Sequence, residues 1–169
     1  MTAADGTLQT LDDGRARIRF ERRIDHPVDR VWAAITDPEK MREWWAAADE
    51  LDLREGGAFT IRWLNSDDEG NVAIARGTIS AIDPPHLIEL DSDIHGVMRW
   101  ELRPDGDATA LTFTSTLNLP DEFRDKVLAG WHTHLDLLED ALAGRPVEDW
   151  DNWPIDRWRE HNERYASLL

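Results

Sequence analysis

The sequence contains no cysteine, which excludes disulfide bonds, thiolate nucleophiles and cysteine-ligated metal sites. It also contains no run of about 18 consecutive apolar residues, the length that a transmembrane helix requires. The first 15 residues are polar and include no apolar segment of the kind found in signal peptides. These absences predict a soluble protein without membrane insertion, and we expect it in the cytoplasm.

Common catalytic motifs are missing as well. The sequence has neither a G-x-S-x-G nucleophile elbow nor a glycine-rich phosphate loop. Among the six histidines, only His132 and His134 lie close together, and residues two apart on a helix point to different faces. We therefore expect no metal site, no cofactor and no catalytic residues, although the sequence leaves an enzymatic activity open.

Positive charge is scarce, because 19 lysines and arginines face 35 aspartates and glutamates, for a net charge of −16. Such a protein repels phosphate groups, which argues against nucleic acids and anionic membranes as partners. Tyrosine occurs once, whereas tryptophan occurs nine times. Tryptophan rings fill cores, line cavities or form interfaces, and their number alone does not choose among these roles.

The length of 169 residues suits one domain with short additions at its ends. We expect a flexible leader over residues 1–14, a domain over 15–145 and a C-terminal tail over 146–169. Pro154 marks the start of a short helix in the tail. This tail either folds back on its own domain or binds a partner, as a homodimer contact or a contact with another protein.

Residues 120–144 predict one long amphipathic helix. Pro120 is typical of a helix start, and Gly144 before Arg145 and Pro146 is typical of a helix end. Apolar side chains recur at spacings of three and four and form one stripe: Phe123, Val127, Trp131, Leu135, Leu138 and Leu142. A helix with such a stripe has to lie on another element, and the strand-rich stretch before it provides the surface.

The rest of the chain predicts mainly strands. Residues 15–25 alternate between apolar and charged side chains, which is typical of a half-buried strand. Two short helices follow, one opened by His26 and Pro27 and one over residues 39–46. About six further strands are expected between residues 50 and 117. This order predicts an α+β fold with an antiparallel sheet and the long helix on one side of it.

Four segments carry a family resemblance, in this order along the chain: IDHPVDRVWAAITDPEKMREWW, EGGAFTIRW, RGTISAIDPPHLIEL and GWHTHLDLLEDALAG. Together they resemble the activator-of-heat-shock-protein-ATPase homologue family, within the START-like or SRPBCC superfamily that includes the pollen-allergen-like proteins. The resemblance implies a helix-grip fold, in which a curved antiparallel sheet wraps around a long C-terminal helix and two short helices follow the first strand. It also implies a hydrophobic cavity between sheet and helix.

From the resemblance we expect the protein to bind a small, largely hydrophobic molecule in that cavity. The residues expected to bind it are apolar side chains on the periodic faces, with two polar anchors: Trp63, Trp100, Phe113, Trp131 and Leu135, with His134 and Arg76. Solid packing of the same rings is the alternative interpretation. The superfamily also allows a protein-interaction module that modulates a chaperone ATPase, or an enzyme of the cyclase or hydrolase kind.

Overall fold

The structure is a computed structural model that describes residues 4–169, so the first three residues of the expected leader lie outside it. The strands are β1 (Thr7–Thr10), β2 (Ala16–Ile24), β3 (Ala46–Leu51), β4 (Ala58–Trp63), β5 (Ile74–Asp83), β6 (Leu87–Ser92), β7 (Val97–Asp105) and β8 (Ala108–Leu117). The helices are α1 (Val28–Thr36), α2 (Pro38–Met41), α3 (Arg124–Leu142) and α4 (Ile155–Leu168), with 3-10 turns at Asp121–Phe123 and Trp150–Asn152.

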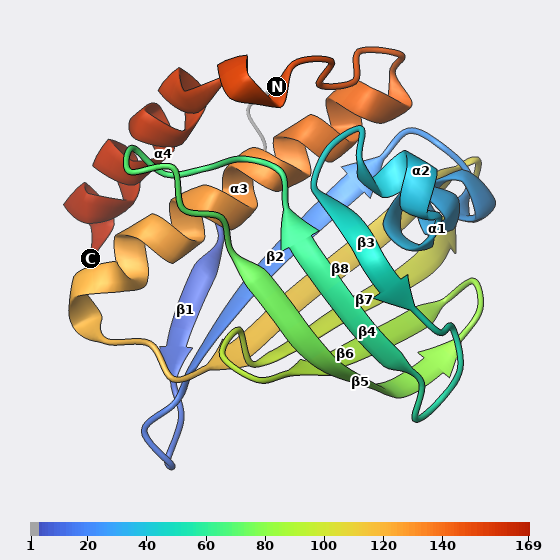
Figure 1. Ribbon diagram of the computed structural model, residues 1–169, viewed down its shortest axis with the longest axis horizontal. Coiled ribbons are helices and arrows are strands. Elements are labelled where there is room, and N and C mark those ends of the chain that lie inside the picture. The colour runs from blue at the N-terminus through green and yellow to red at the C-terminus, as the bar shows by residue number, and fades with distance from the viewer. Residues whose placement is uncertain (1–3) are drawn as a thin grey trace.

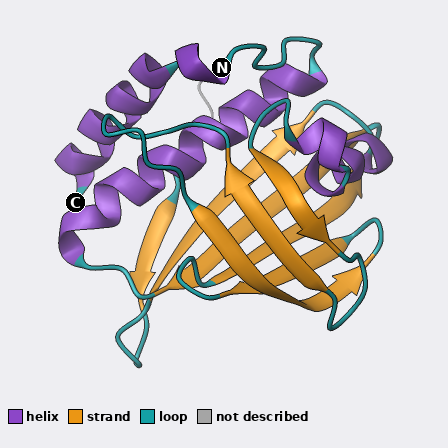
Figure 2. Ribbon diagram, viewed as in Figure 1, coloured by secondary structure: helices purple, strands orange, loops and turns teal. Residues whose placement is uncertain are grey.

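All eight strands form one antiparallel sheet in the order β1-β2-β8-β7-β6-β5-β4-β3. The sheet curves around α3, and α1 and α2 lie together at one end of it (Figure 1, Figure 2). The first long strand, β2, pairs with the last, β8, and places Phe20 opposite Phe113. This architecture confirms the predicted α+β, START-like helix-grip fold.

Strand β2 shows how the sequence pattern sets the inner face of the sheet. Ala16, Ile18, Phe20 and Ile24 are buried, while the odd-numbered residues between them, Arg17, Arg19, Glu21 and Arg23, are exposed. Because strand side chains alternate between faces, Arg22 has the same parity as these apolar residues. Arg22 is indeed buried, and its charge therefore needs partners inside the protein.

The long helix begins later than its first start signal. A 3-10 turn covers residues 121–123, and α3 runs from Arg124 to Leu142. Gly144 follows with a φ of +85°, the left-handed conformation that favours glycine after a helix. The predicted end of the helix is therefore in the right place.

Two expectations need correction. Residues 7–10 of the expected flexible leader form β1, which pairs with β2 and places Thr7 opposite Arg19. The free edge of β2 offers unpaired backbone groups to this segment, and Leu8 packs against the core. The second short helix ends at Met41, because Trp44 and Trp45 are both fully buried and the chain turns there into β3.

The tail lies against its own domain. Helix α4 packs along α3 on the side away from the sheet (Figure 1), and Tyr165 is buried between them. The indole nitrogen of Trp150 donates a hydrogen bond of 2.9 Å to the carbonyl oxygen of Arg42. Within residues 4–169, no helix is long and apolar enough to cross a membrane.

Candidate functional site

The centre of the molecule is a cluster of aromatic rings between α3 and the sheet. The ring centre of Trp131 lies 4.3 Å from that of Phe113, which in turn lies 4.3 Å from that of Trp100. Trp44 and Trp45 complete the cluster at centre distances of 5 to 6 Å. Trp100 and Phe113 are completely buried, so this part of the core is solidly packed.

A cavity of about 180 Å³ lies beside the cluster, between the sheet, α3 and the tail, and it is open on one side. Its lining residues come from all three parts of the fold: Trp63, Asn65, Ala73, His95, Met98, Ser115, Leu117, Val127, Gly130, Trp131, His134, Trp153 and Trp158. The walls are largely apolar, with four tryptophans among them. This cavity is the candidate site.

The alternation of side chains along β4 and the orientation of α3 bring the aromatic lining residues together. Trp63 ends β4 on the same face as Phe59 and Ile61, both of which are buried in the core. Its ring stacks on that of His95 with centres 5.0 Å apart, and it meets Trp131 edge-on at 6.1 Å. The β4 end, the loop before β7 and the middle of α3 thus form one aromatic wall.

Gly130 keeps space open in the middle of α3. Glycine is unfavourable in a helix interior, so its presence calls for a local reason. An added Cβ at this position would find its nearest neighbour, Nε1 of Trp158, 3.9 Å away, and Gly130 itself lines the cavity. The missing side chain leaves part of the cavity empty.

The cavity carries no formal charge. Within the described chain, its lining residues include no lysine, arginine, aspartate or glutamate. Burial lowers the pKa of His134 to about 4, although its Nδ1, 3.0 Å from the carbonyl oxygen of Trp44, makes a hydrogen bond that acts in the opposite direction. Burial also lowers the pKa of His95, against a hydrogen bond to the Ile74 backbone. Both rings are therefore neutral at pH 7.

The structure separates the seven predicted binding residues into three groups. Trp63, Trp131 and His134 line the cavity. Trp100, Phe113 and Leu135 are buried in the packed core behind it. Only the first of these groups has free space beside it.

The seventh residue, Arg76, lies apart from the others. It is exposed on β5, next to the buried Ala75, and therefore faces the outside of the sheet. Glu89 and Arg99 also pair across this outer face, at 2.9 Å. The expectation that Arg76 is a polar anchor of the cavity is therefore wrong in this structure, because its side chain faces away from the cavity and does not line it.

Several lining residues were missed. Met98 shares the parity of Trp100 on β7, so the strand pattern contained its signal. Trp153 and Trp158 belong to the tail, which the sequence alone does not connect with a cavity. His95 and Asn65 lie in loops, for which no periodic pattern gives a direction.

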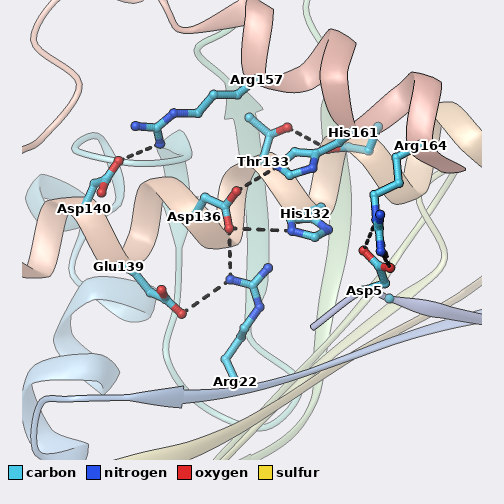
Figure 3. A network of polar contacts seen from close by, with 12 residues as sticks. Asp5, Arg22, His132, Thr133, Asp136, Glu139, Asp140, Arg157, His161 and Arg164 are labelled. Atoms are coloured by element: carbon cyan, nitrogen blue, oxygen red, sulfur yellow. Dashed lines mark hydrogen bonds and ion pairs between the residues drawn. The ribbon is translucent and has the colours of Figure 1, made fainter. Parts of the chain in front are cut away.

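A second group of polar side chains joins β2, α3 and α4 (Figure 3). Nη1 of Arg22 lies 3.0 Å from Asp136 and 3.4 Å from Glu139. Nε2 of His161, on α4, lies 2.8 Å from the other oxygen of Asp136. Burial opposes ionisation of Asp136, but the hydrogen bond from His161 and the charge of Arg22 outweigh it and lower its pKa. The group gives the buried Arg22 two carboxylate partners at Nη1, while its Nε and Nη2 have no hydrogen-bond partner within residues 4–169.

His132, Asp136 and His161 also have ligand atoms within 4.8 Å of one another, as a metal site would. Two features disagree with that use. Arg22 already donates to the Asp136 carboxylate, and a cation would compete with it. The rings of His132 and His161 are stacked, 3.8 Å apart at 25°, so their in-plane lone pairs do not converge on one point. We assign these residues to the contact between α3 and α4.

The comparisons with known proteins agree with this fold. Residues 25–143 match the family described as Activator of Hsp90 ATPase homolog 1-like protein. The chain belongs to this family. A search of curated proteins gave no significant match.

Several solved structures are similar to this chain. CalU16 from Micromonospora echinospora is 28% identical, with a TM-score of 0.73 over 99% of this chain and 98% of that one. The protein BPP1335 from Bordetella parapertussis is also 28% identical, with a TM-score of 0.67 over 100% and 96% of the two chains. Ms6760 from Mycobacterium smegmatis, at 18% identity and a TM-score of 0.68 over 85% and 99%, shows the fold alone. The family match covers residues 25–143, and the similarity in fold to CalU16 and BPP1335 extends over nearly the whole chain.

Proposed function

We propose that this protein binds a small, largely hydrophobic molecule in the cavity between the sheet and α3. The observation that carries the proposal is the open, uncharged cavity of about 180 Å³, walled by Trp63, Trp131, Trp153 and Trp158. Protein interiors are close-packed and contain few voids larger than a water molecule. An apolar cavity of about 150 Å³ is sufficient for benzene.

The cavity size limits the ligand. Pockets for drug-sized molecules span about 300–1,000 Å³. At about 180 Å³, this cavity fits a molecule of one ring or a similarly compact chain. A sterol or a large polyketide exceeds it unless the walls move.

The open side of the cavity gives an access route. An outer pocket of about 220 Å³ shares Asn65, Trp153 and Trp158 with the cavity and is also lined by Asp67 and Asp68. It lies between the turn after β4 and the start of α4. A ligand would pass between this turn and the tail, so the tail would form one wall of the site.

The other functions stay predictions from the resemblance. A role in modulating a chaperone ATPase follows from the description of the family, and no feature of the cavity favours it. A cyclase or hydrolase activity would need convergent acid, base and nucleophile groups. The uncharged cavity lining offers only two neutral histidines and a serine for such roles. Cytoplasmic location and a contact through the tail remain expectations from the sequence.

Tryptophan emission and melting temperature measure binding directly. We expect toluene and benzene to change the emission and raise the melting temperature, with a Kd on the order of 100 µM, or about −5.5 kcal/mol. Cholesterol should have no effect. The Trp32→Phe variant is the control, because Trp32 lies on α1 and does not line the cavity. If no one-ring compound changes either signal, the protein does not bind ligands in this cavity.

A further inference from the structure

Four tryptophans wall the cavity, and their indole N–H groups have no hydrogen-bond partner within residues 4–169. These wall tryptophans are Trp63, Trp131, Trp153 and Trp158. Away from the cavity, Nε1 of Trp44 and Nε1 of Trp150 each donate to a backbone carbonyl, at 2.7 and 2.9 Å. Nε1 of Trp45 and Trp100 is fully buried, whereas Nε1 of each wall tryptophan is not. The wall therefore offers accessible donors that the protein itself does not use.

The indole nitrogen of Trp158 borders the space that Gly130 leaves open in α3. It is the heavy atom nearest to the position of an added Cβ on Gly130, at 3.9 Å. Both residues line the cavity, so this N–H group lies at the cavity wall. Water that enters through the open side can accept its hydrogen bond. A ligand that displaces such a water loses affinity unless it reproduces the bond, so the cavity favours a ligand with an acceptor.

The lining offers few accessible acceptors in return. Oδ1 of Asn65 and Nε2 of His95 are fully buried, so a ligand in the cavity does not reach them. Nδ1 of His134 donates to the carbonyl oxygen of Trp44, because a carbonyl oxygen only accepts, and this leaves Nε2 of His134 as one acceptor. The hydroxyl of Ser115 can donate or accept. Side-chain donors thus outnumber acceptors around the cavity.

The charge of the surroundings disfavours ionic ligands. A carboxylate is also an acceptor, but a buried ion needs a partner of opposite sign, and the cavity lining within the described chain provides none. An anion would also approach past Asp67 and Asp68 in the outer pocket, on a protein with a net charge of −16. A cation has no proton acceptor to offer to the indole N–H groups. An uncharged acceptor fits both the donors and the electrostatics.

We propose that the ligand is an uncharged molecule of about one ring that carries a hydrogen-bond acceptor, such as a carbonyl or a nitrile, and that the indole N–H of Trp158 donates to it. The proposal rests on the proposed function and names the ligand class of the same site. The ring would lie among the wall tryptophans, and its acceptor would face the space beside Gly130. The apolar walls select the ring, and the N–H group selects its substituent.

Benzonitrile and phenylacetylene test the proposal as a pair of nearly equal size and shape, in which an acceptor nitrogen replaces a C–H group. Calorimetry on the full chain at pH 7.5 measures both. We expect benzonitrile to bind about threefold more tightly, because the net gain from one ordinary hydrogen bond corresponds to about that factor. Benzoate and benzylammonium should bind more weakly than either. Benzoate binding most tightly would overturn the proposal and indicate an anion site, and benzylammonium binding most tightly would overturn it and indicate a cation held by the tryptophan faces.

The nitrile stretching band in the infrared spectrum reports the hydrogen bond itself, because it moves to higher frequency when an N–H group donates to the nitrogen. Trp158→Phe removes the N–H group and keeps a ring in the wall. In this variant we expect the band of bound benzonitrile to move to lower frequency and the preference over phenylacetylene to disappear, while phenylacetylene still binds. The matched control is Trp150→Phe, the same substitution in the tail at a residue that does not line the cavity, and it should keep both the band and the preference.

The outcomes separate this proposal from the proposed function. If phenylacetylene binds wild type at least as tightly as benzonitrile, and the nitrile band lies where it does in toluene, the cavity binds ligands but no N–H group selects them, and the present inference is wrong. If Trp158→Phe changes neither the preference nor the band, Trp158 is not the donor and the inference is also wrong. If neither ligand nor toluene binds, the proposed function fails. The wild-type measurements decide the matter even if a variant does not fold.

Discussion

Replacing Gly130 by alanine should stabilise the protein and weaken ligand binding. Glycine in a helix interior costs about 0.5–1 kcal/mol relative to alanine. Gly130 lies inside α3, and an added Cβ would meet no heavy atom closer than 3.9 Å. The free energy of unfolding should therefore rise by about 0.5–1 kcal/mol, which raises the melting temperature by roughly 1–4 °C in a domain of this length.

The same methyl group enters the cavity. One methyl removes a small part of about 180 Å³, so we expect the Kd for toluene to rise only about threefold. Gly130→Leu adds a side chain with four carbons at the same position and should weaken toluene binding by more than tenfold. Leucine is a good helix former, so this variant should stay folded.

Urea denaturation and toluene titration of the same samples make the comparison. Ser167→Ala is the control. Ser167 is exposed on α4 and does not line the cavity, so an alanine there raises helix propensity without changing the binding site. It should raise stability slightly and leave the Kd unchanged. A folded Gly130→Leu protein that binds toluene as wild type does would refute the assigned cavity, and a destabilised Gly130→Ala protein would show that no free space exists there.

Three further predictions concern the buried polar groups and the tail. Because burial lowers the pKa of His132 and His134 from 6.5 to about 4, the unfolded chain takes up protons first as the pH falls. The free energy of unfolding should then drop by roughly 1.4 kcal/mol per histidine between pH 7.5 and 5.5, and equal urea midpoints at both pH values would contradict this. The Tyr165 hydroxyl accepts a hydrogen bond from the Gly6 backbone and makes another with Nδ1 of His132, both at 2.7 Å. Tyr165→Phe removes both bonds and should lower the free energy of unfolding, measured by urea denaturation, by about 2 kcal/mol. A decrease below about 0.5 kcal/mol would show that these bonds are unimportant. Deleting residues 148–169 should lower the free energy of unfolding by a few kcal/mol, because it uncovers α3 and removes the buried Tyr165. If the melting temperature is instead unchanged and light scattering shows a different oligomeric mass, the tail acts at an interface.

Periodic patterns made most of the fold predictable. The alternation in residues 15–25 and the stripe on residues 120–144 each need one buried face, which determines strand or helix and the direction of that face. The resemblance supplied the curvature of the sheet and the expectation of a cavity. The short strand β1 carries little pattern in four residues, and its pairing depends on an edge that exists only in the folded sheet.

The site was predictable only in part, because facing inward is not the same as facing free space. Trp63, Trp100 and Phe113 all point inward, yet only Trp63 reaches the cavity, while the other two are surrounded by rings. The difference depends on the volumes of all neighbours together. Asn65 and His95 lie in loops whose directions follow from the tertiary structure.

The most direct test of ligand binding in this cavity is a phenol titration followed by the indole N–H signals of the nine tryptophans in a ¹H–¹⁵N spectrum. The proposal predicts saturable shifts for the wall residues Trp63, Trp131, Trp153 and Trp158, with the signal of Trp32 on α1 unchanged. If the four wall signals stay still at millimolar phenol, or move no more than that of Trp32, the cavity is not a ligand site.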